Sequence, residues 1–459
     1  MGAQLIRAEE AVQPRPIWCV TPQNWREVAG GIPTPATAFA EASGFKGEPG
    51  ALLVLPAADG TIAGVLFGVE EAPRDPLAFG KLATSLPAGD YAIARAPADP
   101  RLAALGFLLG GYRFTRYRKR NGADIRLAVP EGVDADAVLR TAEAVTLTRD
   151  LVNTPANDLG PAEIEAAVRA LAARFGAQVS VTAGDDLLAA NFPLVHAVGR
   201  ASPRAPRLID LTWGDVNARK VTLVGKGVAF DTGGLDIKPS SGMLLMKKDM
   251  GGAANAIGLA QMIMARNLPV RLRLIVPAVE NAIDGSAFRP GDIFPSRKGL
   301  TVEIGNTDAE GRLILADALS LADEEAPELL VDFATLTGAA RVALGPELPP
   351  AYTDDETLAA DLARHGAAEA DPSWRLPLWR PYAAMLDSKI ADLNNAPGGG
   401  FAGSITAALF LQRFVERAGA WLHLDIYAWN PSSRPGRPEG GEAQTIRALD
   451  ALIAERFGG

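Results

Sequence analysis

The sequence predicts an α/β protein of two domains: a small N-terminal α/β domain, residues 1–132, and a larger C-terminal domain, residues 133–459, with a mostly parallel sheet flanked by helices. The chain has 459 residues, and at roughly 150 residues per domain this length suits two or three domains. Hydrophobic residues make up 48% and charged residues 22%, as in ordinary globular proteins. After residue 132, apolar strand-like runs alternate with helix-like segments, which is typical of a buried parallel sheet.

The N-terminal 132 residues mix short apolar runs with Gly and Pro breaks, as a small α/β domain would. One stretch is basic, and it contains Arg113, Arg116, Arg118, Lys119, Arg120 and Arg126. It is either a nucleic-acid patch or a solvated strand edge whose charges oppose aggregation. Because 45 basic and 54 acidic residues leave a net charge of −9, we favour the strand edge and expect no nucleic-acid partner.

The C-terminal domain opens with a predicted linker helix over residues 133–152, which stops before Pro155. An amphipathic helix begins at Pro161 and stops at Gly176. The predicted strands are Arg207–Trp213, Lys220–Val224, Leu272–Val279, Thr301–Ile304, Leu329–Ala334 and Trp421–Ala428. The predicted helices that follow are Ala253–Ala265, Leu313–Ala322 and Ala402–Ala418.

Polar segments follow three of these strands, at the end where open α/β sheets bind ligands. Strand 220–224 leads into residues 225–234 (GKGVAFDTGG), and strand 301–304 leads into residues 305–312 (GNTDAEGR). Strand 329–334 ends in residues 335–339 (TLTGA), which are polar and uncharged. We therefore expect the chemistry of this protein at the carboxyl edge of the sheet.

Carboxylates are the main candidates for that chemistry. Asp308, Glu310 and Arg312 are spaced by two, so in an extended loop they point to the same side. Asp231 follows an apolar stretch, where a lone charge is costly to bury, and Asp249 stands just before a helix. Ordinary helix capping is the alternative for Asp249, Asp308 and Glu310. Together the four carboxylates could neutralise two divalent cations such as Mg, Mn or Zn, which suggests a bimetallic hydrolytic site.

The sequence predicts a cytoplasmic protein with no membrane partner. A single cysteine, Cys19, cannot form an internal disulfide, which fits a reducing compartment. The N-terminal residues carry charges and a proline where a secretory signal needs an apolar run. The longest apolar runs fall far short of the roughly 20 residues that span a bilayer.

Four segments resemble the leucyl (cytosol) aminopeptidases, peptidase family M17. They are residues 224–234 (VGKGVAFDTGG), 237–240 (IKPS), 246–254 (MKKDMGGAA) and 306–313 (NTDAEGRL). The octapeptide NTDAEGRL is highly specific for this family. The resemblance extends from about residue 149 to the C-terminus, and residues 1–132 match loosely.

The resemblance implies a role for each matching residue. It assigns metal ligation to Lys226, Asp231, Asp249, Asp308 and Glu310, with Lys226 as a neutral amine. It makes Lys238 the catalytic lysine that stabilises an oxyanion, and Arg312 the holder of a bicarbonate that shuttles a proton. It places the substrate at Met246, Thr335, Leu336 and Gly338. The implied cofactors are two divalent ions per subunit, Zn or Mn with Mg as a further option.

The implied activity is that of a metal-dependent aminopeptidase, in which two metals activate the water that releases N-terminal amino acids from peptides with a free amine. A homohexamer is implied as well. The alternative is a catalytically idle or moonlighting family member that acts as a nucleic-acid-binding regulator. Residues 424–430 (LDIYAWN) depart from the family's usual LDIAGTAW, and this segment helps to shape the side-chain pocket in relatives. The resemblance therefore leaves the preferred N-terminal residue open.

Overall fold

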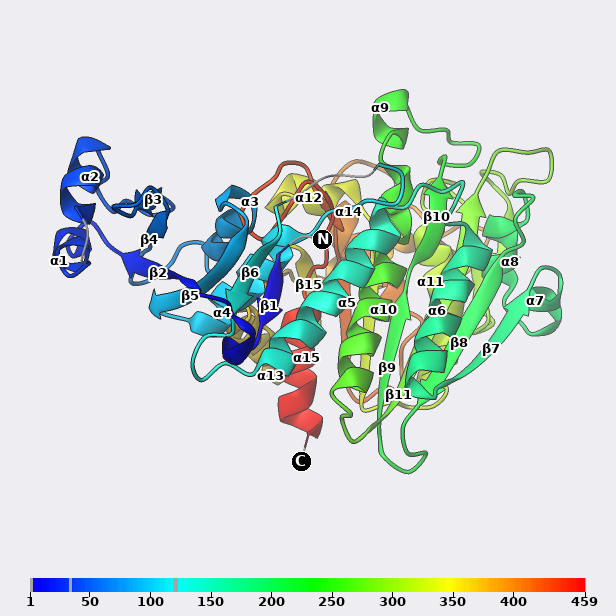
Figure 1. Ribbon diagram of the computed structural model, residues 1–459. Coiled ribbons are helices and arrows are strands. Elements are labelled where there is room, and N and C mark those ends of the chain that lie inside the picture. Colours follow the sequence, from blue (N-terminus) through cyan, green and yellow to red (C-terminus); the bar gives the residue numbers. More distant parts are fainter. Residues whose placement is uncertain (1–2, 33–34, 119–122, 459) are drawn as a thin grey trace. The chain divides into compact units, whose positions relative to one another are not determined.

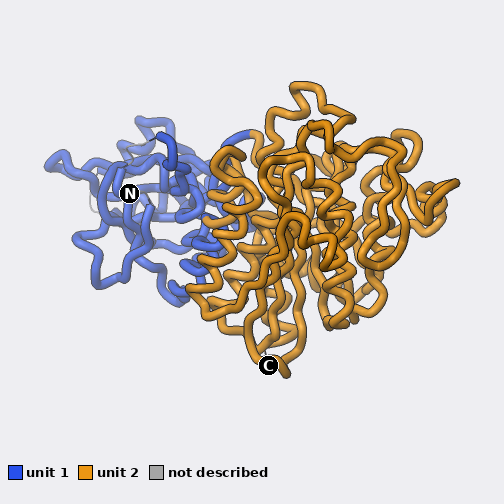
Figure 2. Tube along the Cα trace, turned by 90° about the vertical axis from the view of Figure 1, so that its right-hand side faces the viewer, with its two compact units in different colours: residues 1–146, 432–439 blue, residues 147–431, 440–459 orange. Residues whose placement is uncertain are grey.

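The computed structural model describes residues 3–32, 35–118 and 123–458 and divides into two compact units. One unit contains residues 1–146 and 432–439, and the other contains residues 147–431 and 440–459 (Figure 2). The dividing point lies within helix α5 (Ala135–Asn153), in the segment for which the sequence predicts a linker helix. Lys119 and Arg120 of the basic stretch lie outside the described residues. The predicted fold class, α/β with a smaller N-terminal and a larger C-terminal part, is confirmed.

The first unit is built on a six-stranded sheet in the order β1-β6-β5-β2-β4-β3. Its strands are β1 (Gln4–Ile6), β2 (Arg15–Val20), β3 (Leu52–Pro56), β4 (Ile62–Gly68), β5 (Gly89–Arg95) and β6 (Ile125–Ala128). Only β3 pairs antiparallel among these neighbours. Its helices are α1 (Trp25–Gly30), α2 (Ala36–Ala42), α3 (Leu82–Ser85) and α4 (Pro100–Gly111). Val65 and Phe67 belong to one hydrophobic cluster and Leu66 to another, because alternate residues of a strand face opposite sides.

The second unit is built on a nine-stranded sheet in the order β16-β15-β18-β14-β9-β11-β8-β7, with β10 paired to β11. Its strands are β7 (Gln178–Ala183), β8 (Arg207–Trp213), β9 (Arg219–Gly225), β10 (Gly227–Asp231), β11 (Val270–Asn281), β14 (Leu329–Ala334), β15 (Pro350–Tyr352), β16 (Trp374–Arg375) and β18 (Trp421–Asp425). The central strands β11, β9, β14 and β18 run parallel. Strand β8 pairs antiparallel with β11 and with β7. The carboxyl ends of the parallel strands therefore share one edge of the sheet.

Helices cover both faces of this sheet (Figure 1). The helices of this unit are α6 (Pro161–Phe175), α7 (Asp186–Ala189), α8 (Pro193–Gly199), α9 (Ser240–Met243), α10 (Gly251–Ala265), α11 (Glu310–Asp323), α12 (Gly338–Leu344), α13 (Glu356–Ala368), α14 (Gly403–Gln412) and α15 (Ile446–Phe457). Helices α6, α10 and α15 pack together on one side, and α8, α11 and α14 share a hydrophobic cluster on the other. Among the described residues, no helix has the length and apolar character needed to cross a bilayer.

Apart from shifts of up to three residues at the ends of elements, three predicted elements differ from those observed. Strand β13 (Thr301–Glu303) is not part of the main sheet, because it pairs with β12 (Ile293–Pro295) and β17 (Leu393–Asn394) in a separate sheet. The helix predicted over 402–418 ends at Gln412, and Asp323 accepts hydrogen bonds from the backbone of residues 416–418. The strand predicted to Ala428 ends at Asp425. Ala428 adopts a left-handed conformation with φ of 56°, which an extended strand does not contain.

Candidate active site

The carboxyl edge of the second sheet brings distant residues together. Asp231 ends β10, and Lys226 lies between β9 and β10. Asp249 lies in a short 3-10 helix, η3 (Met246–Met250), directly before α10. Asp308 precedes α11, and Glu310 is the first residue of that helix. All five residues that the resemblance names as metal ligands therefore come from segments that meet at this edge.

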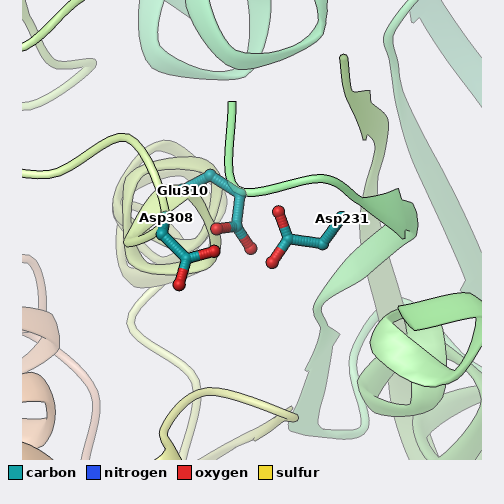
Figure 3. A group of neighbouring side chains, drawn as sticks. All are labelled: Asp231, Asp308 and Glu310. Carbon is teal, nitrogen blue, oxygen red and sulfur yellow. The ribbon is translucent and has the colours of Figure 1, made fainter. Parts of the chain in front are cut away.

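Three carboxylates form the centre of the site. Oxygens of Asp231, Asp308 and Glu310 lie within 4.8 Å of one another, and Figure 3 shows their carboxylate groups close together. Burial, with the charge of Asp231 added, raises the pKa of Asp308 to about 6. The same two causes raise the pKa of Glu310 well above its usual range. The fold therefore holds like charges at a separation that needs cations to offset it.

Two lysines tie the four carboxylates into pairs. Nζ of Lys226 lies 2.8 Å from Oδ2 of Asp249 and 3.0 Å from Oε1 of Glu310. Nζ of Lys238 lies 2.8 Å from Oδ2 of Asp231, and it also forms an ion pair with Asp308. Each ammonium group therefore bridges two acidic side chains.

These ion pairs shift the pKa values of their members. Burial opposes the charge of Lys226, but Asp249 and Glu310 outweigh burial and raise the pKa of Lys226 above its usual value. Burial likewise opposes the charge of Lys238, and chiefly Asp231 raises the pKa of Lys238. Burial works against the negative charge of Asp249, yet Lys226 lowers its pKa. In this geometry the two ammonium groups act as counter-ions for the four carboxylates.

The site fits hard divalent cations. Among the described residues, Oε2 of Glu310 has no partner, and lysine ammonium groups are the only partners of Oδ2 of Asp249, Oδ1 of Asp308 and Oε1 of Glu310. Buried polar atoms are almost always hydrogen-bonded, so Oε2 of Glu310 is available to a ligand, and the other three oxygens become available when the lysines give up these contacts. Carboxylate oxygens with one amine nitrogen suit Mg, Mn or Zn. The chemistry of the donor set therefore agrees with a cluster of two cations.

Helix capping does not account for these carboxylates. The residue at the N-cap of α10 is Met250, and that of α11 is Ala309, and neither helix start has a side-chain cap hydrogen bond. Oδ1 of Asp249 instead accepts a hydrogen bond of 2.8 Å from Oγ1 of Thr335. The capping alternative for Asp249, Asp308 and Glu310 is therefore not the observed role.

Two glycines make room for this arrangement. A Cβ at Gly311 would lie 2.4 Å from Cε of Lys226, so a side chain there would displace the lysine. A Cβ at Gly252 would lie 2.2 Å from the carbonyl oxygen of Phe333, at the end of β14. Helix α10 can approach the sheet this closely because the residue at its start lacks a side chain.

Arg312 lies in the first turn of α11, so the expectation of one extended loop from Asp308 to Arg312 is wrong. Helix α11 begins at Glu310, and residues two apart on a helix face different sides. Arg312 is buried, and its Nη1 donates to the carbonyl of Asn395. No acceptor among the described residues meets its Nε, and burial lowers the pKa of Arg312 to about 10. A buried guanidinium with an unused donor fits a small anion.

The residues expected to bind substrate lie beside Asp249. Met246 is buried in η3. Thr335 follows β14, and its carbonyl oxygen accepts a hydrogen bond of 3.1 Å from Nζ of Lys226. The backbone N–H of Leu336 donates to Oδ1 of Asp425 over 3.0 Å, and Gly338 begins α12. Thr335 therefore borders the carboxylates, and the hydrogen bond to Asp425 holds the backbone of Leu336 in place.

The sequence reasoning missed Asn281 and Thr307. Nδ2 of Asn281 donates to Oδ1 of Asp231 over 2.9 Å. Oγ1 of Thr307 donates to the carbonyl of Gly233 over 2.6 Å. Asn281 is the last residue of β11, so the rule that ligands gather at strand ends could have found it. Thr307 lies within the NTDAEGRL segment, but it is uncharged, so it has no sequence signal of its own beside Asp308 and Glu310.

Two family models match the chain. The catalytic domain of the cytosol aminopeptidase family matches residues 146–450, and the M17 aminopeptidase N-terminal domain matches residues 16–130. A probable cytosol aminopeptidase of Rhizobium rhizogenes is 40% identical over 374 residues, which cover 77% of this chain and 74% of that protein. Its counterpart in Geobacter is 42% identical over 362 residues, which cover 75% of this chain and 73% of that protein.

Solved structures are similar over nearly the whole chain. The cytosol aminopeptidase from Coxiella burnetii superposes with a TM-score of 0.94 at 46% identity, and the match covers 99% of each chain. The bottromycin maturation enzyme BotP in complex with Mn has a TM-score of 0.86 at 34% identity. That match covers 97% of this chain and 100% of BotP.

Proposed function

The chain belongs to the cytosol aminopeptidase family, M17, and from this we propose that it is a metal-dependent aminopeptidase that removes N-terminal amino acids from peptides. The observation that carries the proposal is the meeting of four acidic side chains with two lysines at one edge of the sheet. Within the described part of the chain, lysine ammonium groups are the only partners of three of their buried oxygens, and Oε2 of Glu310 has no partner. An aminopeptidase that works with divalent cations uses such a cluster.

The proposed cofactors are two divalent cations per subunit, Zn or Mn, with Mg as a further option. When bound, such cations supply Lewis-acid activation of water and of the peptide carbonyl. Lys226, Asp231, Asp249, Asp308 and Glu310 would hold these ions. Lys226 has to lose its proton to serve as a ligand. The ion pairs that Asp249 and Glu310 form with its ammonium group would then be given up. The neighbour BotP, whose structure is described as a complex with Mn, supports this choice of cofactor.

The chain's own residues define where a peptide is cut. Asp249 is proposed to accept a hydrogen bond from the free α-amine of the substrate, so that only the first peptide bond reaches the reacting position. Lys238 is proposed to stabilise the oxyanion that develops on the carbonyl, since its side chain is 15% exposed and lies beside Asp231 and Asp308. One such donor typically contributes about 10²–10³-fold in rate.

Arg312 is the proposed holder of bicarbonate. Its buried guanidinium and the unpaired Nε support an anion at this place. A bicarbonate bound there would accept and return a proton. Met246, Thr335, Leu336 and Gly338 are the proposed contacts for the substrate's N-terminal residue.

The proposed assembly is a homohexamer in the cytoplasm, with peptides as its substrates. The curated relatives are named cytosol aminopeptidases, which supports this location. Neither the fold nor the comparisons favour the alternative, a catalytically idle or nucleic-acid-binding regulator.

Hydrolysis of amino-acyl p-nitroanilides, measured with Mn or Zn and again after chelation, tests the proposal. We expect release of p-nitroaniline that stops on chelation and returns when the cation is restored. Amides with an acetylated α-amine should remain intact, because Asp249 then has no free amine to bind. Cleavage of the acetylated amides at an equal rate would overturn the aminopeptidase assignment.

A further inference from the structure

Tyr427, the aromatic residue that departs from the family pattern, lies against two cationic side chains. Nζ of Lys248 is 4.9 Å from the centroid of its ring, and Cζ of Arg341 is 4.8 Å from the same centroid. Both distances are within the range of a cation–π contact. We refer to Tyr427, Lys248 and Arg341 as the Tyr427 cluster.

The Tyr427 cluster adjoins the residues proposed to bind the substrate's N-terminal residue. Lys248 directly precedes Asp249 in η3. Nη1 of Arg341 donates to the carbonyl of Thr337 over 3.0 Å. A Cβ placed on Gly338 would lie 3.6 Å from Nη2 of Arg341, so the guanidinium lies over that glycine. Gly338 is exposed and Arg341 is partly exposed, so a ligand can reach the guanidinium.

The backbone of Tyr427 is held in place. Oε1 of Gln444 accepts hydrogen bonds from the N–H groups of Tyr427 and Ala428, at 2.9 and 2.8 Å. The N–H of Glu442 donates to the carbonyl of Ala428 over 3.0 Å. Ala428 adopts a left-handed φ of 56°, which an L-residue keeps only where its surroundings enforce it. The backbone that carries the Tyr427 ring is therefore fixed, and the ring contacts both cations.

The two cations lack a carboxylate partner. In the described ranges, neither Lys248 nor Arg341 forms an ion pair of 4.0 Å or less with an acidic side chain. Asp249 is the nearest acidic neighbour along the chain, but Lys226 pairs with its Oδ2 and Thr335 donates to its Oδ1. Lys248 is only 2% exposed. Arg341 is the partly exposed member of the pair, so its guanidinium is the group with which an arriving carboxylate can form charge-assisted hydrogen bonds.

We propose that the Tyr427 cluster selects peptides whose N-terminal residue has an acidic side chain, Glu or Asp. This inference rests on the proposed aminopeptidase function and names the substrate class of the same site. The guanidinium of Arg341 can donate two parallel hydrogen bonds to a carboxylate, and such charge-assisted pairs are about twice as strong as neutral ones. A leucine side chain leaves both cations unpaired, and a lysine side chain is repelled by them.

The test compares kcat/KM for Glu-, Leu- and Lys-p-nitroanilides at one fixed Mn concentration. In the wild type we expect kcat/KM to be highest for the Glu substrate, lower for the Leu substrate and lowest for the Lys substrate. Arg341→Met should lower the ratio of Glu to Leu by about tenfold or more, because one charged hydrogen-bond partner is lost. Arg341→Lys should retain part of the preference for the Glu substrate, and Arg341→Glu should move the preference toward the Lys substrate.

Arg364→Met is the matched control, since Arg364 pairs with Asp361 and Glu455 on the surface. The ratio of kcat/KM for the Glu and Leu substrates in this variant should equal that of the wild type.

The outcomes separate the two proposals. The acidic preference is overturned if the wild type cleaves the Leu substrate and its kcat/KM for the Glu substrate is equal or lower. The aminopeptidase function is then still supported. Failure to cleave all three substrates with any cation overturns both. Thermal unfolding of each variant shows whether it is folded. If Arg341→Met does not fold, the order of kcat/KM in the wild type still decides, because the preference must already be present in the unmodified protein.

Discussion

Nδ2 of Asn281, at the end of β11, donates a hydrogen bond of 2.9 Å to Oδ1 of Asp231, at the end of β10. The same amide donates to the carbonyl of Thr307 over 3.1 Å, and Asn281 is fully buried. The N–H of Gly233 also donates to Oδ1 of Asp231. With Oδ1 occupied in this way, Oδ2 is the oxygen that faces Lys238. Asn281 therefore sets the orientation of a proposed metal ligand without belonging to the ligand set.

Replacing Asn281 should weaken cation binding. In Asn281→Ala we expect the affinity for Mn to fall about 10- to 100-fold, the usual effect of removing a partner that orients a ligand. Calorimetric titration of the purified protein with Mn measures this directly. Asn217→Ala is the control, because Asn217 is exposed in a surface turn. Equal affinities for Mn in both variants would contradict the positioning role.

Removing the cations should lower thermal stability. Bound cations offset the repulsion among Asp231, Asp308 and Glu310, and a ligand at 100 times its dissociation constant stabilises the folded state by about 2.7 kcal/mol. We expect the Tm to fall by several degrees on chelation and to recover when Mn or Zn is added. The variant Asp308→Asn should show a smaller recovery. A Tm that does not respond to cations in the wild type would argue against a metal cluster.

Substituting Lys238 should slow the chemical step. Lys238→Met loses the proposed oxyanion donor, so we expect kcat to fall about 10²–10³-fold with a smaller change in KM. Steady-state kinetics with a saturating cation provide the measurement, and circular dichroism verifies the fold. Lys220→Met is a suitable control, because Lys220 donates to the carbonyl of Glu325 at the opposite end of β9. Unchanged turnover in Lys238→Met would reject its assignment.

The buried pair of His423 and Asp332 should make stability depend on pH. Nδ1 of His423 lies 2.6 Å from Oδ1 of Asp332. Burial opposes a charged imidazole, but Asp332 outweighs burial and raises the pKa of His423 above its usual value. The folded protein therefore holds this proton more tightly than the unfolded chain does. The stabilisation is complete below the unfolded-state pKa of about 6.5 and is lost as the pH rises through the folded-state pKa.

Urea unfolding of the wild type and of His423→Gln across pH 5 to 9 measures this effect. The wild type should lose stability toward the alkaline end of that range, and the variant should lack this slope. The variant should also be about 3–5 kcal/mol less stable at acidic pH, since the buried Asp332 loses its partner. His196→Gln is the control, because His196 contacts the exposed Asp185. Parallel slopes for the wild type and His423→Gln would contradict the ion pair.

A methyl group at Gly252 should disturb the contact between helix α10 and the sheet. The Cβ of Gly252→Ala would lie 2.2 Å from the carbonyl oxygen of Phe333, so the backbone of helix α10 or of strand β14 has to move. We expect a loss of about 1–3 kcal/mol in the free energy of unfolding, as for other overpacked sites. Gly285→Ala is the control, because a Cβ at Gly285 meets nothing within 4 Å. Chemical denaturation compares the two, and equal stabilities would contradict the close approach.

Much of the second unit could be predicted from local patterns. The strand at Arg207–Trp213 and the helix from Pro161 to Phe175 have the expected bounds, because period-2 and helical patterns of apolar residues are local signals. Strand β13 shows the limit of such signals. Its residues form a strand as expected, but which sheet it joins depends on β12 and β17, which lie elsewhere in the chain.

The amino-acid sequence alone determined the family of this protein and the residue types of its site, because NTDAEGRL and GKGVAFDTGG are contiguous and specific. Tertiary structure alone decided which groups meet. It paired Lys226 with Asp249 and Glu310, oriented Asp231 through Asn281, and placed Tyr427 between Lys248 and Arg341. These contacts join residues tens to hundreds of positions apart, and their geometry depends on sheet order and helix packing, which no short segment of sequence specifies.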